Sequence, residues 1–283
     1  MNSTKWLARV RERMLSTTEV IPVHPDDIEF LSRFHVVKTC PRHTVEWDEF
    51  IEPLTIHGRH PHSFASCGNG LTGNRHNDPR VPHTYIQDTS YVLLQNDFDL
   101  QRHTSHPRHA RHYFLDAGTS TFDSSLFWFT CGYAQNNISF NQVYGWEYTL
   151  LEPNNFWSRV PEKWKPFWHF YNVPIAESQV KPNSAVSFIK NLARPEDFVS
   201  FKLDIDTPNV EIPIVLDILN DSSITTLIDE FFFELHFRCD FLMSCGWGSK
   251  IPETYMGLKL DRPRVLEVFG DLRRKGIRSH FWP

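Results

Sequence analysis

Apolar and polar positions follow two different patterns in the two parts of this chain. From residue 111 onward, short continuous apolar runs alternate with segments whose apolar residues recur every three or four positions. The continuous runs indicate strands buried on both faces, and the second pattern indicates helices that each bury one face. Before residue 111 this alternation is missing. We therefore expect an accessory segment over residues 1–110 and a folded domain over residues 111–283.

The predicted domain alternates strands and helices along its whole length. Strands are expected at residues 111–118, 142–148, 169–175, 198–206, 230–237 and 277–283, and helices at 123–133, 153–160, 183–193, 208–221 and 262–276. Pro208 suits the first turn of a helix, and Gly276 suits the position that follows one. Such alternation predicts an α/β fold with a doubly wound parallel sheet, whose ligand crevice lies at the carboxyl ends of the strands.

The accessory segment is expected to consist of short helices and loops. Amphipathic patterns predict helices at about Trp6–Leu15 and Asp26–Phe34. Residues 53–82 are rich in Gly, His, Pro and Asn without a regular period, which indicates a long loop. Because a bare sheet leaves its crevice open to water, we expect Ile56–His112 to fold over the carboxyl ends of the strands as a lid.

Composition and charge exclude several function classes. The formal net charge is −5 and no long block of Lys or Arg occurs, so we expect a small-molecule acceptor as partner, with no nucleic acid and no membrane. The five cysteines lack CxxC spacing, which predicts neither a disulfide framework nor a thiolate zinc site and favours a reducing, cytoplasmic compartment. No run of 18 apolar residues occurs, so no membrane span is expected.

Two strand ends carry candidate cofactor contacts. Asp116 and Gly118 lie where the first strand turns into a helix, and a residue without a side chain lets backbone amides approach a ligand there. An ordinary turn explains this short motif equally well. The second strand ends in Trp146 and Glu147, and an acid at this place can accept hydrogen bonds from both ribose hydroxyls of a nucleotide-like cofactor. Together the two strand ends favour a cofactor site.

Five motifs follow one another in the domain: FLDAGTSTF, VYGWEYTLLEP, HFYNVPI, DFVSFKLDIDTPNVE and DEFFFELHF. In these motifs the chain resembles the FkbM-type S-adenosylmethionine-dependent methyltransferases, especially their algal and protist relatives, over about Tyr113 to Trp282. The resemblance implies a class I methyltransferase (Rossmann-like) fold with S-adenosylmethionine as cofactor, Asp116 and Gly118 near its methionine part and Glu147 on its ribose. With their neighbours, the candidate cofactor contacts are Asp116, Gly118, Thr119, Ser120, Trp146, Glu147 and Asp204.

The chain departs from this family pattern in three places. Phe122 stands where a second glycine usually follows the first, and its benzyl group is expected to narrow the cofactor pocket. The fourth-strand motif usually reads lysine, apolar, aspartate, apolar, glutamate, glycine, whereas residues 202–207 read KLDIDT. The last strands are reduced to residues 277–283, with residues 90–95 as a candidate extra edge strand.

The fourth and fifth strands carry the most reactive side chains. Asp204 and Asp206 are two positions apart and share one face of a strand, as do Glu234 and His236. If these strands are neighbours, the four groups converge and form either a divalent-metal site or an acid/base cluster with Asp206, His236 and Glu234 as catalytic groups. The alternative is structural: Lys202 neutralises one aspartate, Glu234 caps a backbone amide, and His236 is a satisfied crevice histidine.

These residues lead to one expected function and two alternatives. We expect methyl transfer from S-adenosylmethionine to an oxygen of a small acceptor, such as a sugar or secondary-metabolite hydroxyl, with Asp206 or His236 as the base. The first alternative is a metal-dependent glycosyltransferase, because Asp204-Ile205-Asp206 is also a DxD pattern. The second is a non-catalytic methyltransferase-like binding protein, whose altered glycine turn no longer binds the cofactor.

Overall fold

The computed structural model describes residues 33–40, 43–52, 54, 92–104, 110–179, 181–236 and 251–282. The predicted helix at Trp6–Leu15, most of the one at Asp26–Phe34, and residues 55–91 of the predicted loop and lid lie outside these ranges. Within the part of the chain that is described, no helix is both long and apolar enough to cross a lipid bilayer.

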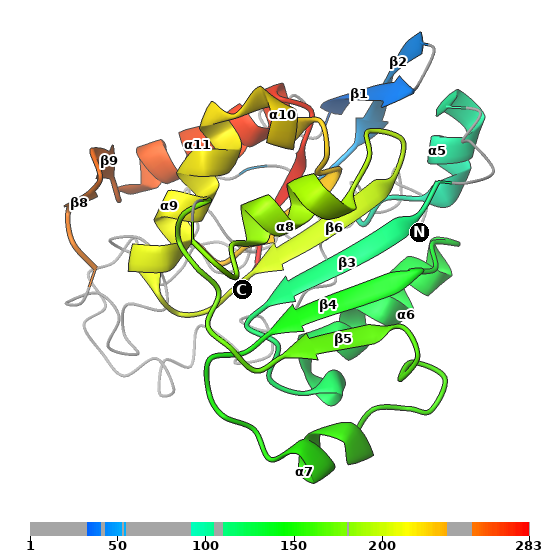
Figure 1. Cartoon of the computed structure of the whole chain (residues 1–283). Helices are drawn as coiled ribbons and strands as arrows, with labels where there is room; N and C mark the ends of the chain where they lie inside the picture. The colour runs from blue at the N-terminus through cyan, green and yellow to red at the C-terminus, as the bar shows by residue number, and fades with distance from the viewer. Residues whose placement is uncertain are drawn as a thin grey trace, which may run out of the picture.

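A six-stranded parallel sheet forms the centre of the domain (Figure 1). Its strands in chain order are β3 (His112–Ala117), β4 (Gln142–Trp146), β5 (Trp168–Tyr171), β6 (Phe198–Leu203), β7 (Glu230–Phe233) and β10 (Arg278–Phe281). They lie side by side in the order β10-β7-β6-β3-β4-β5, which is the order of a doubly wound Rossmann-like sheet. The predicted α/β fold is confirmed. The order reverses between β3 and β6, so the topological switch point lies at the carboxyl ends of these two strands.

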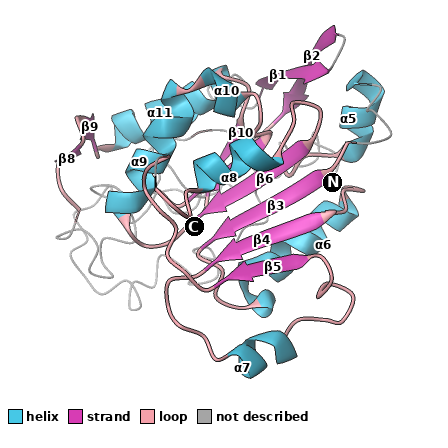
Figure 2. Cartoon of the chain, in the orientation of Figure 1, coloured by secondary structure: helices cyan, strands magenta, loops and turns pink. Residues whose placement is uncertain are grey.

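Helices cover both faces of the sheet (Figures 1 and 2). One face carries the π-helical turn η3 (Phe122–Leu126), α6 (Phe127–Gln135) and α7 (Pro153–Ser158), and the other carries α8 (Ala185–Leu192), α9 (Pro208–Asn220), α10 (Ser222–Thr225) and α11 (Arg262–Arg274). Side chains of successive strand residues point alternately to the two faces of the sheet and pack under the helices there. Phe114 and Phe232 pack with Phe129 of α6, whereas Leu115 and Phe201 belong to the core under α8 and α9. Burial on both faces explains the continuous apolar runs in the sequence.

Local sequence signals set where several helices begin. The Glu152 side chain accepts a hydrogen bond from the Asn155 N–H at the start of α7, and Asp261 accepts one from Arg264 at the start of α11. Pro208 occupies the first turn of α9, and Gly276 follows α11 with a φ of 89°, as both were predicted to do. A small hairpin of β8 (Thr254–Tyr255) and β9 (Leu258–Lys259) precedes α11.

The described accessory residues form an antiparallel hairpin, β1 (Arg33–Cys40) with β2 (His43–Phe50), and helix α5 (Asp97–Thr104). The prediction of helices and loops was therefore incomplete: Phe34 lies in a strand, and no strand forms at residues 92–95. The missed signal is an alternation of period two in β1, where Phe34, Val36 and Lys38 are buried. A buried alternating strand indicates a sheet face that packs on the domain.

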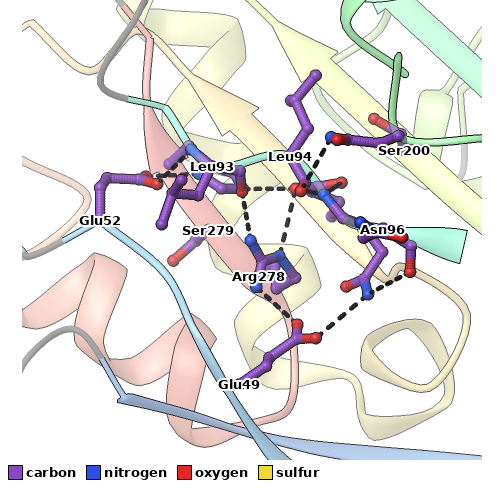
Figure 3. A network of polar contacts seen from close by, with 12 residues as sticks. Glu49, Glu52, Leu93, Leu94, Asn96, Ser200, Arg278 and Ser279 are labelled. Atoms are coloured by element: carbon purple, nitrogen blue, oxygen red, sulfur yellow. Dashed lines mark hydrogen bonds and ion pairs between the residues drawn. The ribbon is translucent and has the colours of Figure 1, made fainter. Parts of the chain in front are cut away.

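The accessory residues dock at the amino-terminal end of the large sheet through buried charges (Figure 3). Arg278, at the start of β10, donates hydrogen bonds to the Glu49 carboxylate at 2.6 Å and to the backbone carbonyl of Leu93. The Gln95 N–H donates to the carboxylate of Glu230, the first residue of β7. Residues 92–95 therefore lie at the end of the sheet opposite the predicted crevice. The lid prediction is wrong for this described portion of Ile56–His112.

Candidate functional site

Lys202 joins two carboxylates inside the sheet. Its Nζ lies 3.2 Å from Asp116 Oδ1 and 2.9 Å from Asp204 Oδ2, and the β3 and β6 register places Asp116 directly opposite Lys202. Burial alone would lower the pKa of Lys202, but the two carboxylates outweigh burial and raise it. Burial likewise opposes ionisation of Asp204, yet Lys202 holds the pKa of that carboxyl below its usual value. At this end of β6 the Lys202 ammonium group therefore lies between the carboxyl groups of Asp116 and Asp204.

Asp206, Glu234 and His236 come together beyond the ends of β6 and β7. His236 Nε2 lies 3.4 Å from Asp206 Oδ1 and 3.6 Å from Glu234 Oε2, and one ligand atom from each residue falls within 4.8 Å of the others. Glu234 and His236 are buried, whereas Asp206 is exposed. The Glu234 N–H donates to the Leu203 carbonyl, which continues the pairing of the two strands. All four predicted residues therefore lie near one another: ligand atoms of Asp206, Glu234 and His236 lie together, while Asp204 pairs with Lys202 and also shares a hydrogen bond with the Glu234 carboxyl group.

The loop that carries Asp206 is anchored by Glu211 in the first turn of α9. The Glu211 carboxyl accepts a hydrogen bond of 3.0 Å from the Ile205 N–H. Burial raises the pKa of Glu211 to about 8, and the nearby charges of Asp204 and Glu234 add to the shift. Glu211 was not among the residues predicted from the sequence. The available signal was an acid among the apolar positions of PNVEIPIVL, where most neighbours are buried.

The glycine turn after β3 is closed by the protein's own backbone. The N–H groups of Gly118 and Thr119 both donate to the carbonyl of Trp146, at 2.9 and 3.0 Å. Gly118 has a φ of 96°, and a β-carbon there would clash with the Asp204 carbonyl oxygen. The glycine is therefore required for contact between the ends of β3 and β6. The two amides predicted to face a ligand are already satisfied within the sheet.

Burial divides the predicted cofactor contacts into two groups. Asp116, Thr119 and Trp146 are buried, and Trp146 packs on the rings of Tyr171 and Phe188 at 5.5 and 5.1 Å. Ser120 is exposed, and Glu147 and Asp204 are partly exposed. The predicted contacts whose side chains are accessible to a ligand, Ser120, Glu147 and Asp204, therefore follow β3, β4 and β6.

Phe122 does not stand in the crevice. It is buried and packs against Trp168 at 5.6 Å and Trp164 at 6.2 Å, in the core between α6 and the sheet. The expectation that its ring narrows the cofactor pocket is therefore wrong. An aromatic ring at this position fills the core beneath the π-helical turn that begins with it.

Glu147 stands at the carboxyl tip of β4 in a fixed turn. Its Oε1 accepts a hydrogen bond of 2.6 Å from the Thr149 N–H, and its backbone carbonyl accepts one from Asn172. Tyr148 and Leu150 beside it expose 80% and 86% of their surface. An acid next to exposed apolar groups is suited to a ligand with both hydroxyls and a flat ring.

Comparison with known proteins does not assign the chain to a family. Neither a protein-family model, nor a curated protein, nor a solved structure matches it. What this site does is therefore argued from its fold, charges and geometry.

Proposed function

We propose that residues 111–283 are an S-adenosylmethionine-dependent methyltransferase domain of class I that methylates a hydroxyl of a small acceptor, such as a sugar or secondary metabolite. The observation that carries the proposal is the set of acidic residues after neighbouring strand ends at and beside the switch point of a Rossmann-like sheet. Asp204 and Asp206 follow β6, and Glu234 and Glu147 follow β7 and β4. S-adenosylmethionine bears a sulfonium and an ammonium group, and carboxylates favour such cations electrostatically. The five sequence motifs lead to the same cofactor.

The accessible groups suggest which residues hold the cofactor. Ser120, Glu147 and Asp204 have exposed surface at three neighbouring strand ends. Glu147 would accept hydrogen bonds from ribose hydroxyls, as acids at this strand tip do in related folds. Gly118, Thr119, Asp116 and Trp146 would act indirectly by shaping the loop that carries Ser120. When bound, S-adenosylmethionine supplies an already activated methyl group.

The protein's remaining task is to orient an acceptor hydroxyl and remove its proton. Asp206 exposes 62% of its side chain, whereas the side chain of His236 is fully buried. We therefore propose that Asp206 receives the proton and that His236, 3.4 Å away, orients it with Glu234.

Ligand binding tests the proposal directly. S-adenosylhomocysteine should raise the melting temperature of the full chain, while UDP- and GDP-sugars should leave it unchanged. The glycosyltransferase alternative predicts the reverse result. The geometry does not favour that alternative, because Asp206 of the DxD pattern joins the group of possible metal ligands while Asp204 pairs with Lys202. Stabilisation by none of these compounds would support a non-catalytic binding protein.

A further inference from the structure

The atoms of Asp206, Glu234 and His236 are spaced like the ligands of one ion. The two distances from His236 Nε2 are 3.4 and 3.6 Å. Hydrogen bonds from a ring N–H to a carboxylate are shorter, at about 2.7–3.2 Å. Two ligand atoms around a tetrahedral metal with bonds of about 2.1 Å lie about 3.4 Å apart. The contact with Asp206 is therefore a long hydrogen bond, and the two spacings from His236 Nε2 are also compatible with a shared metal ion.

We propose that Asp206, Glu234 and His236 bind one divalent metal ion, and that zinc fits this ligand set best. One imidazole nitrogen and two carboxylate oxygens are all established zinc ligands, whereas magnesium and calcium take oxygen ligands. Three protein ligands with one open position are the arrangement of catalytic zinc sites. The site does not depend on cofactor binding, but with the ion bound Asp206 would serve as a ligand, and the metal-bound oxygen rather than Asp206 would carry the acid/base role in the proposed methyl transfer.

A second observation is a buried carboxylate oxygen at this end of the sheet, on Asp116 beside Lys202 and Asp204. Asp116 Oδ2 is fully buried and has no hydrogen-bond partner among the residues that the structure describes. Buried carboxylates are costly unless cations offset them. A divalent ion bound at the neighbouring strand ends would offset part of this cost.

The ligands are held before any ion arrives. Glu234 is fixed by the backbone bond from its N–H to Leu203, and the loop bearing Asp206 is fixed by Glu211. His236 is buried next to them. Rigid ligands from two neighbouring strand ends lose little freedom on binding, which favours affinity. The open position would accept an oxygen from water or from a hydroxylated substrate, and the ion would lower the pKa of that oxygen's proton.

Cobalt(II) and zinc titrations of the chelator-treated full chain test the site. The wild-type chain should bind cobalt(II) with the absorption spectrum of a four-coordinate ion, and added zinc should displace the cobalt and remove that absorption. Asp206→Asn and His236→Gln should each lower the affinity for zinc and cobalt at this site at least tenfold. Because Asp206 is exposed, its substitution leaves the core untouched and keeps the test valid if the histidine variant does not fold.

His35→Gln is the matched control. His35 also faces two carboxylates, with Nδ1 3.0 Å from Asp48 and Nε2 3.5 Å from Glu46, but on the exposed hairpin. Its substitution should leave the cobalt spectrum and zinc affinity unchanged. Most of the chain's histidines precede Tyr113, and they could bind metal ions at other places. The test therefore compares zinc and cobalt affinity between variants, and does not rely on the total amount of bound metal.

Equal cobalt spectra and zinc affinities in wild type and Asp206→Asn would overturn the proposal. The titration contains no S-adenosylhomocysteine, so this result would not bear on the methyltransferase proposal. Conversely, if the chain binds zinc at this site but does not bind S-adenosylhomocysteine, the metal-site proposal is supported and the methyltransferase proposal is contradicted.

Discussion

Gly118 lies so close to Asp204 that a β-carbon at position 118 would be 1.7 Å from the Asp204 carbonyl oxygen. No pair of non-bonded atoms tolerates that distance, and the φ of 96° at Gly118 also disfavours any side chain. The contact joins the ends of β3 and β6, which are neighbours in the sheet. The glycine therefore holds the switch point together whether or not a ligand is present.

Gly118→Ala should destabilise the domain by about 2–5 kcal/mol, since the backbone must move and take a strained conformation. Urea unfolding of the full chain measures the change. Gly257→Ala is the control, because Gly257 also has a positive φ of 80° but a β-carbon added there would meet no atom within 4 Å. Its cost should be only about 1 kcal/mol. Equal losses in the two variants would show that the contact with Asp204 is unimportant.

Lys202→Met should cost about 3–5 kcal/mol of unfolding free energy, because it leaves the buried Asp116 and Asp204 carboxylates without their ammonium partner. Adding Asp116→Asn to this variant should recover part of the loss. As a control, Lys165→Met removes the surface pair with Glu162 and should cost less than about 1 kcal/mol. A Lys202 variant as stable as the Lys165 variant would argue against a charged Lys202 in the core.

His280 makes the docking of the accessory segment depend on pH. Its Nδ1 lies 2.5 Å from Glu52 and its Nε2 2.9 Å from Glu230, so both ring nitrogens face carboxylates. Burial lowers the pKa of His280, but the carboxylates outweigh it and raise the pKa above 6.5. The pKa of Glu52 is lowered to about 2, because His280 and Arg273 outweigh its burial.

The stability contributed by protonated His280 should be fully present below about pH 6.5 and lost as pH rises through its raised pKa. The contribution of Glu52 should be lost as pH falls from its ordinary range toward 2. His280→Gln should therefore lower the unfolding free energy by about 1–3 kcal/mol near pH 6 and by less near pH 9. Urea unfolding of both chains across this range measures the difference. A difference that does not change with pH would rule out a protonated His280.

Glu147→Ala should weaken S-adenosylhomocysteine binding about 30- to 150-fold, which corresponds to about 2–3 kcal/mol for a charge-assisted contact to two hydroxyls. Calorimetric titration gives the dissociation constant. Glu162→Ala, which removes an exposed acid that pairs with Lys165, should leave the constant unchanged. An unchanged constant in a folded Glu147 variant would mean that the ribose is not bound there.

Residue pattern alone determined the core of the domain. The six strands and five main helices lie close to their predicted ranges, because strands buried on both faces read as continuous apolar runs and caps and prolines mark helix starts. Alternation along a strand also predicted that Glu234 and His236 share one face, and the structure brings them together although both follow the end of β7 at Phe233. Strand and helix periods repeat within a few residues, so they can be predicted from short stretches of sequence.

Only the tertiary structure decided which partners these residues take. Asp116 and Lys202 are 86 positions apart, and Glu52 and His280 are 228 apart. Whether Asp204 joins a metal site or an ion pair, and which end of the sheet receives the accessory hairpin, depends on strand order and register. These are set by packing between distant segments, which no local period of apolar and polar residues records.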